Sequence, residues 1–171
     1  MSTVRSHLMV AAPRTEPGLP PVPAEAGTGS SQSDAIEQEG VIMGDFNTVT
    51  VPAKTEGGVK SGVTVQRDEL FTVSGSGRAS YNGGNTFPDG TRYMNAKYAG
   101  AYTAPDLVLP GAPVGMLIAR IGSGPWLAVG STQTFRAGDA GEITVAYNDR
   151  PGAYVDNSGE YTAMIQNHGS A

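Results

Sequence analysis

The strongest constraint on the fold is the density of residues that break regular structure. The 171-residue chain contains 24 glycines and 12 prolines, and both residue types interrupt helices and end strands. Between them lie short alternating or β-branched runs at residues 48–51, 62–65 and 70–74, which are typical of strands. The apolar run at residues 114–122 predicts a buried strand. With no helical period in the sequence, we expect about eight short strands in an antiparallel β-sandwich or jelly roll.

The composition restricts the partners and the location of the protein. A formal net charge of −5 disfavours nucleic-acid binding, which usually needs a basic surface. The chain has no cysteine, so it can form neither a disulfide nor a thiolate site. No apolar stretch approaches a membrane span in length, and the apolar patch at residues 8–12 is too short for a signal peptide. We therefore expect synthesis in the cytoplasm without membrane insertion, and leave open display on a virion or particle surface and release from the cell.

Residues 1–36 predict an N-terminal arm or linker, and residues 37–171 a β-sandwich domain. The arm is rich in proline, glycine and serine, and residues 17–23 favour extended polyproline geometry. Such a segment cannot build a core of its own, and it orders only when it binds a partner. We therefore expect residues 1–34 to attach the protein to other copies of itself or to a larger assembly.

A long, oxygen-rich connection lies between two of the expected strands. The run at residues 143–147 leads into it and the run at residues 160–165 leads out. Inside it, Asp149, Asp156 and Asn157 supply side-chain oxygens, and two turn-forming dipeptides fold the backbone back on itself so that these oxygens can converge. Hard cations such as calcium take about six to eight oxygen ligands. The composition alone leaves two interpretations open, a cation site and an ordinary polar loop whose Asp and Asn residues cap turns.

The loop and two further stretches resemble a known family. The carrying residues are 143–149, Pro151-Gly152, Tyr154 and 157–159, with support from residues 62–81 and 113–122. This pattern resembles the signature of the PA-IL-like (LecA) bacterial galactophilic lectins, over about residues 41–166.

The resemblance implies a galactose-binding-like β-sandwich with one calcium ion, to which a galactoside or related glycan is coordinated directly. Carried over position by position, it implies that calcium is bound by the side chains of Asp149, Asp156 and Asn157 and by the main-chain carbonyls of Tyr81 and Ala153. The residues it implies for sugar binding are Tyr81, Asp149, Arg150, Asp156 and Asn157.

The chain departs from the family pattern at three places. Asp156 replaces an Asn of the family loop, and this added carboxylate should tighten calcium binding. Arg150 replaces a small apolar residue, so its side chain can overhang the sugar or contact an acidic one. The loop before the central strand lacks the His and Gln that the family uses to bind sugar, and in comparable positions it has Tyr93, Asn95, Tyr98 and Asp106. We therefore expect galactoside binding to be weaker than in the family.

Two other functions stay open beside a lectin-like module. The chain could be a structural decoration or fibre subunit of a phage or contractile particle whose sandwich has lost sugar binding. This is compatible with a lectin-like domain displayed through the arm. An enzyme is not expected, because His7 and His168 both lie near the ends of the chain and no acid–base pair stands out.

Overall fold

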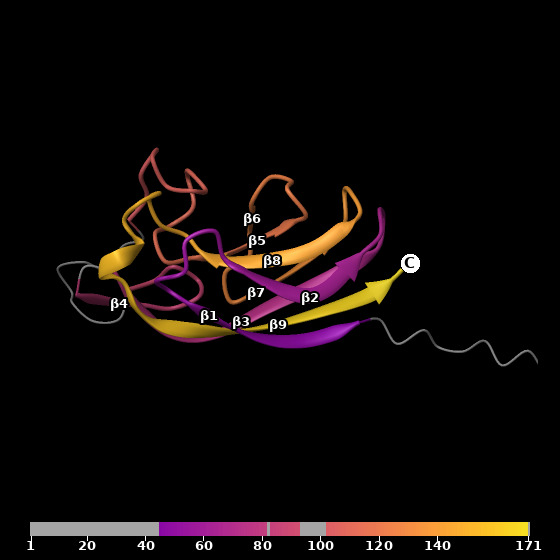
Figure 1. Ribbon diagram of the computed structural model, residues 1–171, viewed down its shortest axis with the longest axis horizontal. Coiled ribbons are helices and arrows are strands. Elements are labelled where there is room, and N and C mark those ends of the chain that lie inside the picture. Colours follow the sequence, from indigo (N-terminus) through magenta and orange to yellow (C-terminus); the bar gives the residue numbers. More distant parts are fainter. Residues whose placement is uncertain (1–44, 82, 93–101, 171) are drawn as a thin grey trace, which may run out of the picture. The chain divides into compact units, whose positions relative to one another are not determined.

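The computed structural model describes residues 45–81, 83–92 and 102–170. These residues form two antiparallel sheets that lie one above the other (Figure 1). The first is a five-stranded sheet in the order β1-β9-β3-β4, with β7 also paired to β3, and the second is a four-stranded sheet in the order β2-β8-β5-β6. This all-β sandwich confirms the fold class predicted from the sequence. The predicted arm at residues 1–36 lies outside the described residues.

The strands follow the β-branched and alternating runs of the sequence. Their bounds are β1 Phe46–Pro52, β2 Val59–Val65, β3 Leu70–Tyr81, β4 Gly84–Thr86, β5 Leu117–Ile121, β6 Leu127–Ala128, β7 Thr132–Arg136, β8 Gly141–Tyr147 and β9 Ser158–Gly169. A short 3₁₀ helix, η2 (Tyr154–Asp156), lies in the connection between β8 and β9. No helix within the three described ranges is long and apolar enough to cross a membrane.

The sequence predicts that residues 77–81 extend the strand at residues 70–74, and β3 is one continuous strand across its glycines, because β9 pairs with it from Leu70 to Ser80. Two details differ from the sequence prediction. β5 begins only at Leu117, because the preceding residues form turns and Gly115 has a left-handed φ of +82°. The short strand β4, which was not predicted, pairs with the end of β3 through Ala79↔Thr86 and its neighbours.

The hydrophobic core lies between the sheets. In β9 the residues Tyr161, Ala163 and Ile165 are buried and alternate with exposed residues, as expected for a strand with one solvated face. The central strand β8 is buried from Ile143 to Tyr147, which explains its continuous apolar sequence. Burying these side chains supplies the main driving force for packing the two sheets together.

A buried polar network joins the sheets where β8 ends. Thr86 Oγ1 lies 2.8 Å from the hydroxyl of Tyr147 and 3.1 Å from that of Tyr161. The Tyr161 hydroxyl donates to the carbonyl of Gly115 at 2.7 Å. Because Thr86, Tyr147 and Tyr161 come from β4, β8 and β9, this network fixes the base from which the β8–β9 connection starts.

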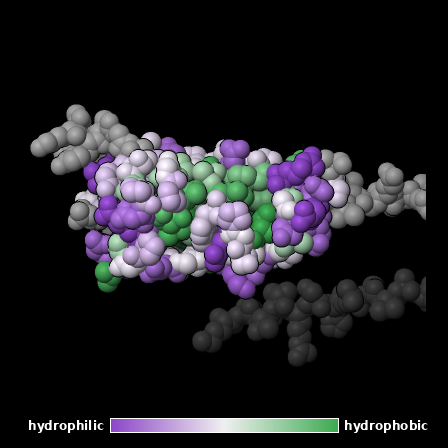
Figure 2. Space-filling model, turned by 90° about the horizontal axis from the view of Figure 1, so that it is seen from above, coloured by the Kyte–Doolittle hydropathy of each residue, from purple (hydrophilic) through white to green (hydrophobic). Residues whose placement is uncertain are grey.

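One face of the described body is more polar at its ends than in its middle. Seen from above, hydrophilic residues gather at both ends and hydrophobic residues lie between them (Figure 2). Two of the exposed large hydrophobic residues, Tyr102 and Val155, are 48% and 82% exposed. Val155 belongs to η2 in the β8–β9 connection, and Tyr102 contacts that connection through Arg150.

Candidate functional site

The β8–β9 connection, residues 148–157, lies at the end of the sandwich away from the C-terminus (Figure 1). Its first residue, Asn148, is fully buried and anchors the start of the connection. Its amide nitrogen donates to the carbonyls of Leu109, Ala112 and Pro113 at 3.2, 3.3 and 3.0 Å, and its amide oxygen accepts from the N–H of Leu109 at 2.9 Å. Every polar atom of this side chain is therefore used to fix the start of the loop.

The turn between β1 and β2 holds the other side of the loop. The N–H of Gly152 donates to Glu56 Oε1 at 3.1 Å, and Asn157 Nδ2 donates to the carbonyl of Ala53 at 3.0 Å. The N–H of Ala53 in turn donates to the carbonyl of Gly159 at 3.0 Å. Contacts on both sides of the loop therefore set the positions of its oxygens.

Within the loop, the structure brings Asp149 and Asn157 into direct contact. Both are buried, with exposed fractions of 6% and 0%. Asn157 Nδ2 donates to Asp149 Oδ2 at 2.7 Å, and the main-chain N–H of Arg150 donates to Asp149 Oδ1 at 2.7 Å. A carboxylate offers about four acceptor positions, so after these two bonds each oxygen can still bind a cation.

One oxygen at this contact lacks a partner. Among the described residues, Asn157 Oδ1 is the only buried side-chain acceptor without a hydrogen bond. The amide cannot simply turn over, because its nitrogen donates to both Ala53 and Asp149. An unsatisfied buried polar atom costs about 1–3 kcal/mol, and a bound cation would satisfy this oxygen. The donor set of amide and carboxylate oxygens therefore fits calcium, the ion that the sequence resemblance implies.

The remaining predicted ligands lie around this pair with different exposure. Asp156 is exposed at the end of η2, and Ala153 is half-buried with its N–H donating to the carbonyl of Arg150 at 3.0 Å. No group of three or more His, Cys, Asp or Glu side chains forms within the described ranges. Any cation in this loop would therefore be held by a mixed set of carboxylate, amide and main-chain oxygens.

Tyr81 ends β3 beside the loop. The guanidinium of Arg92 lies 4.5 Å from the centre of its ring. Burial raises the pKa of the Tyr81 hydroxyl, the positive charge of Arg92 opposes this rise, and the charge of Asp149 adds to it. Ser80 pairs with Ser158, so the end of β3 lies beside the end of the connection that contains Asn157.

Arg150 is held by two neighbours from the preceding connection. Its Nε lies 2.8 Å from Asp106 Oδ2, and its Nη2 donates to the Tyr102 hydroxyl at 2.7 Å. The hydrogen bond and the charge of Asp106 raise the pKa of Arg150. Of the residues predicted to replace the family's sugar-binding His and Gln, Asp106 thus reaches the loop, whereas Tyr93, Asn95 and Tyr98 lie outside the described residues.

Sequence reasoning missed three parts of the site. Asn148 was not singled out, because the sequence does not distinguish an anchoring Asn from a ligand. Ala53 acts through its carbonyl, which every residue type possesses. The pairing of Asp106 with Arg150 joins two distant loops, and opposite charge alone was too general a signal to find it.

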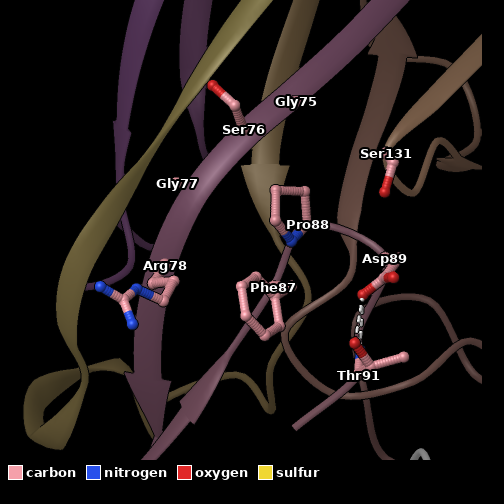
Figure 3. Close-up of a pocket in the computed structure, with 9 residues that line it drawn as sticks. All are labelled: Gly75, Ser76, Gly77, Arg78, Phe87, Pro88, Asp89, Thr91 and Ser131. Carbon is pink, nitrogen blue, oxygen red and sulfur yellow. Dashed lines mark hydrogen bonds between the residues drawn. The ribbon is translucent and has the colours of Figure 1, made fainter. Parts of the chain in front are cut away.

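A separate pocket of about 570 Å³ lies along the glycine-rich part of β3. It is lined by residues 75–78, by residues 87–89 with Thr91, and by Ser131 (Figure 3). At one side of it, the N–H and the hydroxyl of Thr91 both donate to Asp89 Oδ1, at 2.9 and 2.7 Å. None of the residues predicted to bind calcium or sugar lines this pocket, so it is distinct from the candidate site.

Comparison with known proteins agrees with the geometry. The model of the family described as PA-IL-like protein matches residues 47–170. Among solved structures, the N-terminal domain of EclA, a PllA-like lectin, is similar with 26% sequence identity and a TM-score of 0.55, over 71% of this chain and 95% of that one. Comparison with curated proteins gives no match. The matched span contains the β8–β9 connection, so the similarity extends over the candidate site.

Proposed function

Because this chain belongs to the PA-IL-like protein family, we propose that it is a calcium-dependent carbohydrate-binding module of the galactoside type. The lectin-like fold supports carbohydrate binding, and a binding role in place of catalysis. The single observation that carries the calcium part of the proposal is the buried, unpartnered Asn157 Oδ1 in contact with Asp149.

In this proposal the calcium ligands come from two parts of the chain. The β8–β9 connection supplies the side chains of Asp149, Asp156 and Asn157 and the carbonyl of Ala153, and β3 supplies the carbonyl of Tyr81. The two carboxylates match the charge of a divalent ion, which favours tight binding. Calcium takes about six to eight oxygens, so the bound ion would leave positions for two neighbouring sugar hydroxyls.

The chain's own residues would orient the sugar around that ion. Asp149 and Asn157 are already fixed by the contacts to Ala53 and to the N–H of Arg150, so little order has to be gained on binding. Arg150 borders the same site, and its side chain is 44% exposed. Its N–H groups can donate to sugar oxygens, which replaces part of the polar recognition that the absent His and Gln give in the family.

Calorimetric titration of methyl galactosides tests this function. The wild-type protein should bind the sugar with calcium and lose it in excess chelator, and Asp149→Ala should lose calcium and sugar together. Asp139→Ala is a matched control, because Asp139 is an exposed carboxylate that pairs with Arg67 at 3.4 Å near the start of β8. Sugar binding that persists in excess chelator would refute the calcium mechanism.

We also propose that the module is displayed on an assembly through residues 1–34. The support is that, within the described residues, the first strand begins at Phe46 and the family match begins at residue 47, so every described strand of the sandwich follows the arm in the sequence. Size-exclusion chromatography with light scattering, on the full chain and on the chain without residues 1–34, tests this role. A particle that contains the same number of copies before and after the deletion would contradict it.

A further inference from the structure

Three side chains form a polar cluster beside the candidate calcium loop, and we call Tyr102, Asp106 and Arg150 the Arg150 cluster. Arg150 is bound to Asp106 by an ion pair of 2.8 Å and to the Tyr102 hydroxyl by a hydrogen bond of 2.7 Å. The main chain of Arg150 also donates to Asp149, a proposed calcium ligand, at 2.7 Å. The cluster is therefore continuous with the proposed sugar site.

The chemistry of the cluster suits a sugar ring. A guanidinium has five N–H donors and a carboxylate only acceptors, whereas each sugar hydroxyl both donates and accepts. The Arg150 and Asp106 side chains are 44% and 60% exposed, so both keep surface for a ligand. Tyr102 is 48% exposed and its ring offers an apolar face, on which the C–H face of a pyranose can rest.

The cluster is also rigidly supported. The N–H of Val114 donates to the carbonyl of Tyr102 at 2.8 Å, and the N–H of Val108 donates to the carbonyl of Asp149 at 2.9 Å. Between these two contacts, Ala104 and Leu107 are buried against Val114 in a small apolar cluster. A site held in this way loses little conformational entropy on binding.

We propose that the Arg150 cluster binds the second sugar of a glycan whose terminal sugar occupies the calcium site. The inference rests on the proposed function and assigns its ligand class, a disaccharide or longer glycan with a neutral second hexose. A neutral ring is favoured because Asp106 already neutralises Arg150, so an acidic sugar would have to displace the carboxylate from a charge-assisted bond.

A comparison of disaccharides with monosaccharides tests the subsite. Calorimetry in calcium would compare methyl α- and β-galactoside with melibiose and lactose, and include a galactosyl-glucuronic acid as a disaccharide in which only the second ring is acidic. We expect at least one neutral disaccharide to bind about 5-fold to 10-fold more tightly than the matching methyl galactoside, as for a hydrogen bond or a ring contact of about 1 kcal/mol. Tyr102→Ala and Arg150→Met should each remove most of the affinity advantage of the disaccharide over the methyl galactoside.

The control variant is Arg67→Met, which breaks an exposed Arg–Asp pair away from the loop and should leave this affinity advantage unchanged. The inference is overturned if the methyl galactosides bind with calcium but no disaccharide has an advantage. It is also overturned if Tyr102→Ala keeps the advantage, or if the acidic disaccharide binds most tightly. If no sugar binds the wild-type protein in calcium, the proposed function itself fails, and the two failures are thereby distinguished.

Discussion

Replacing Asn157 by Asp should make the stability of the protein strongly dependent on calcium. Asn157 Nδ2 donates to the carbonyl of Ala53 at 3.0 Å and to Asp149 Oδ2 at 2.7 Å, and Asn157→Asp removes both donors. The bond to the charged group contributes about 1.5–3 kcal/mol and the bond to the carbonyl about 0.5–1.5 kcal/mol. The calcium-free variant should therefore lose about 2–4.5 kcal/mol of unfolding free energy, with repulsion between the two buried carboxylates adding to the loss.

Calcium should recover much of this loss, because the new carboxylate adds ligand charge to the proposed site. A ligand present at about 100 times its Kd stabilises the folded state by about 2.7 kcal/mol. The assay is urea unfolding followed by the fluorescence of the single tryptophan, Trp126, in calcium and in chelator. The difference in unfolding free energy between calcium and chelator should be larger for Asn157→Asp than for the wild-type protein.

Asn148→Asp is the matched control. Asn148 and Asn157 are both fully buried, but the side chain of Asn148 has hydrogen-bond partners for its oxygen and its nitrogen. Asn148→Asp should therefore destabilise the protein without a gain from calcium. Equal calcium effects for both variants, or none for Asn157→Asp, would refute the assignment of Asn157 Oδ1 to a cation.

Three further perturbations test the frame around the site. Gly115→Ala should lower the unfolding free energy by about 2–4 kcal/mol in urea, because its Cβ would lie 2.7 Å from Thr86 Oγ1 at a φ of +82°, whereas Gly111→Ala at φ +83° meets nothing and should cost less. Burial raises the pKa of Tyr154 from 10.0 to about 12. The contribution of its neutral hydroxyl to the unfolding free energy is therefore complete below pH 10 and is lost as the pH rises toward 12. Alkaline titration should show a cooperative loss of near-UV circular dichroism in that range. Deleting residues 1–34 should leave the melting temperature and calcium binding unchanged by calorimetry, and a sandwich that unfolds would contradict the proposed boundary.

Much of the fold was predictable because strand patterns are local. Buried and exposed residues alternate along β9 because one face of this strand is solvated. The run at the end of β8 is mostly apolar because both faces of that strand are covered. The start of β5 at Leu117 was not predictable from its own apolar run. It is set by Gly115, whose carbonyl is fixed by the Tyr161 hydroxyl from a distant strand.

The candidate site was predictable only in part, for the same reason. Asp149 and Asn157 lie in one loop, so their convergence follows from the turns between them. The contacts that orient them come from the carbonyl of Ala53 and from residues 109–113, to which the Asn148 side chain is hydrogen-bonded. Both lie far from the loop in the sequence. Local composition therefore identifies the oxygens of a site, but not the contacts that position them.

A crystal structure of the protein grown with calcium tests the central claim most directly. The account predicts one ion bound by Asn157 Oδ1 and the Asp149 carboxylate at about 2.3–2.6 Å, with anomalous scattering that identifies it as calcium. A well-ordered loop without an ion, with Asn157 Oδ1 bound to water or to a protein donor, would contradict the account.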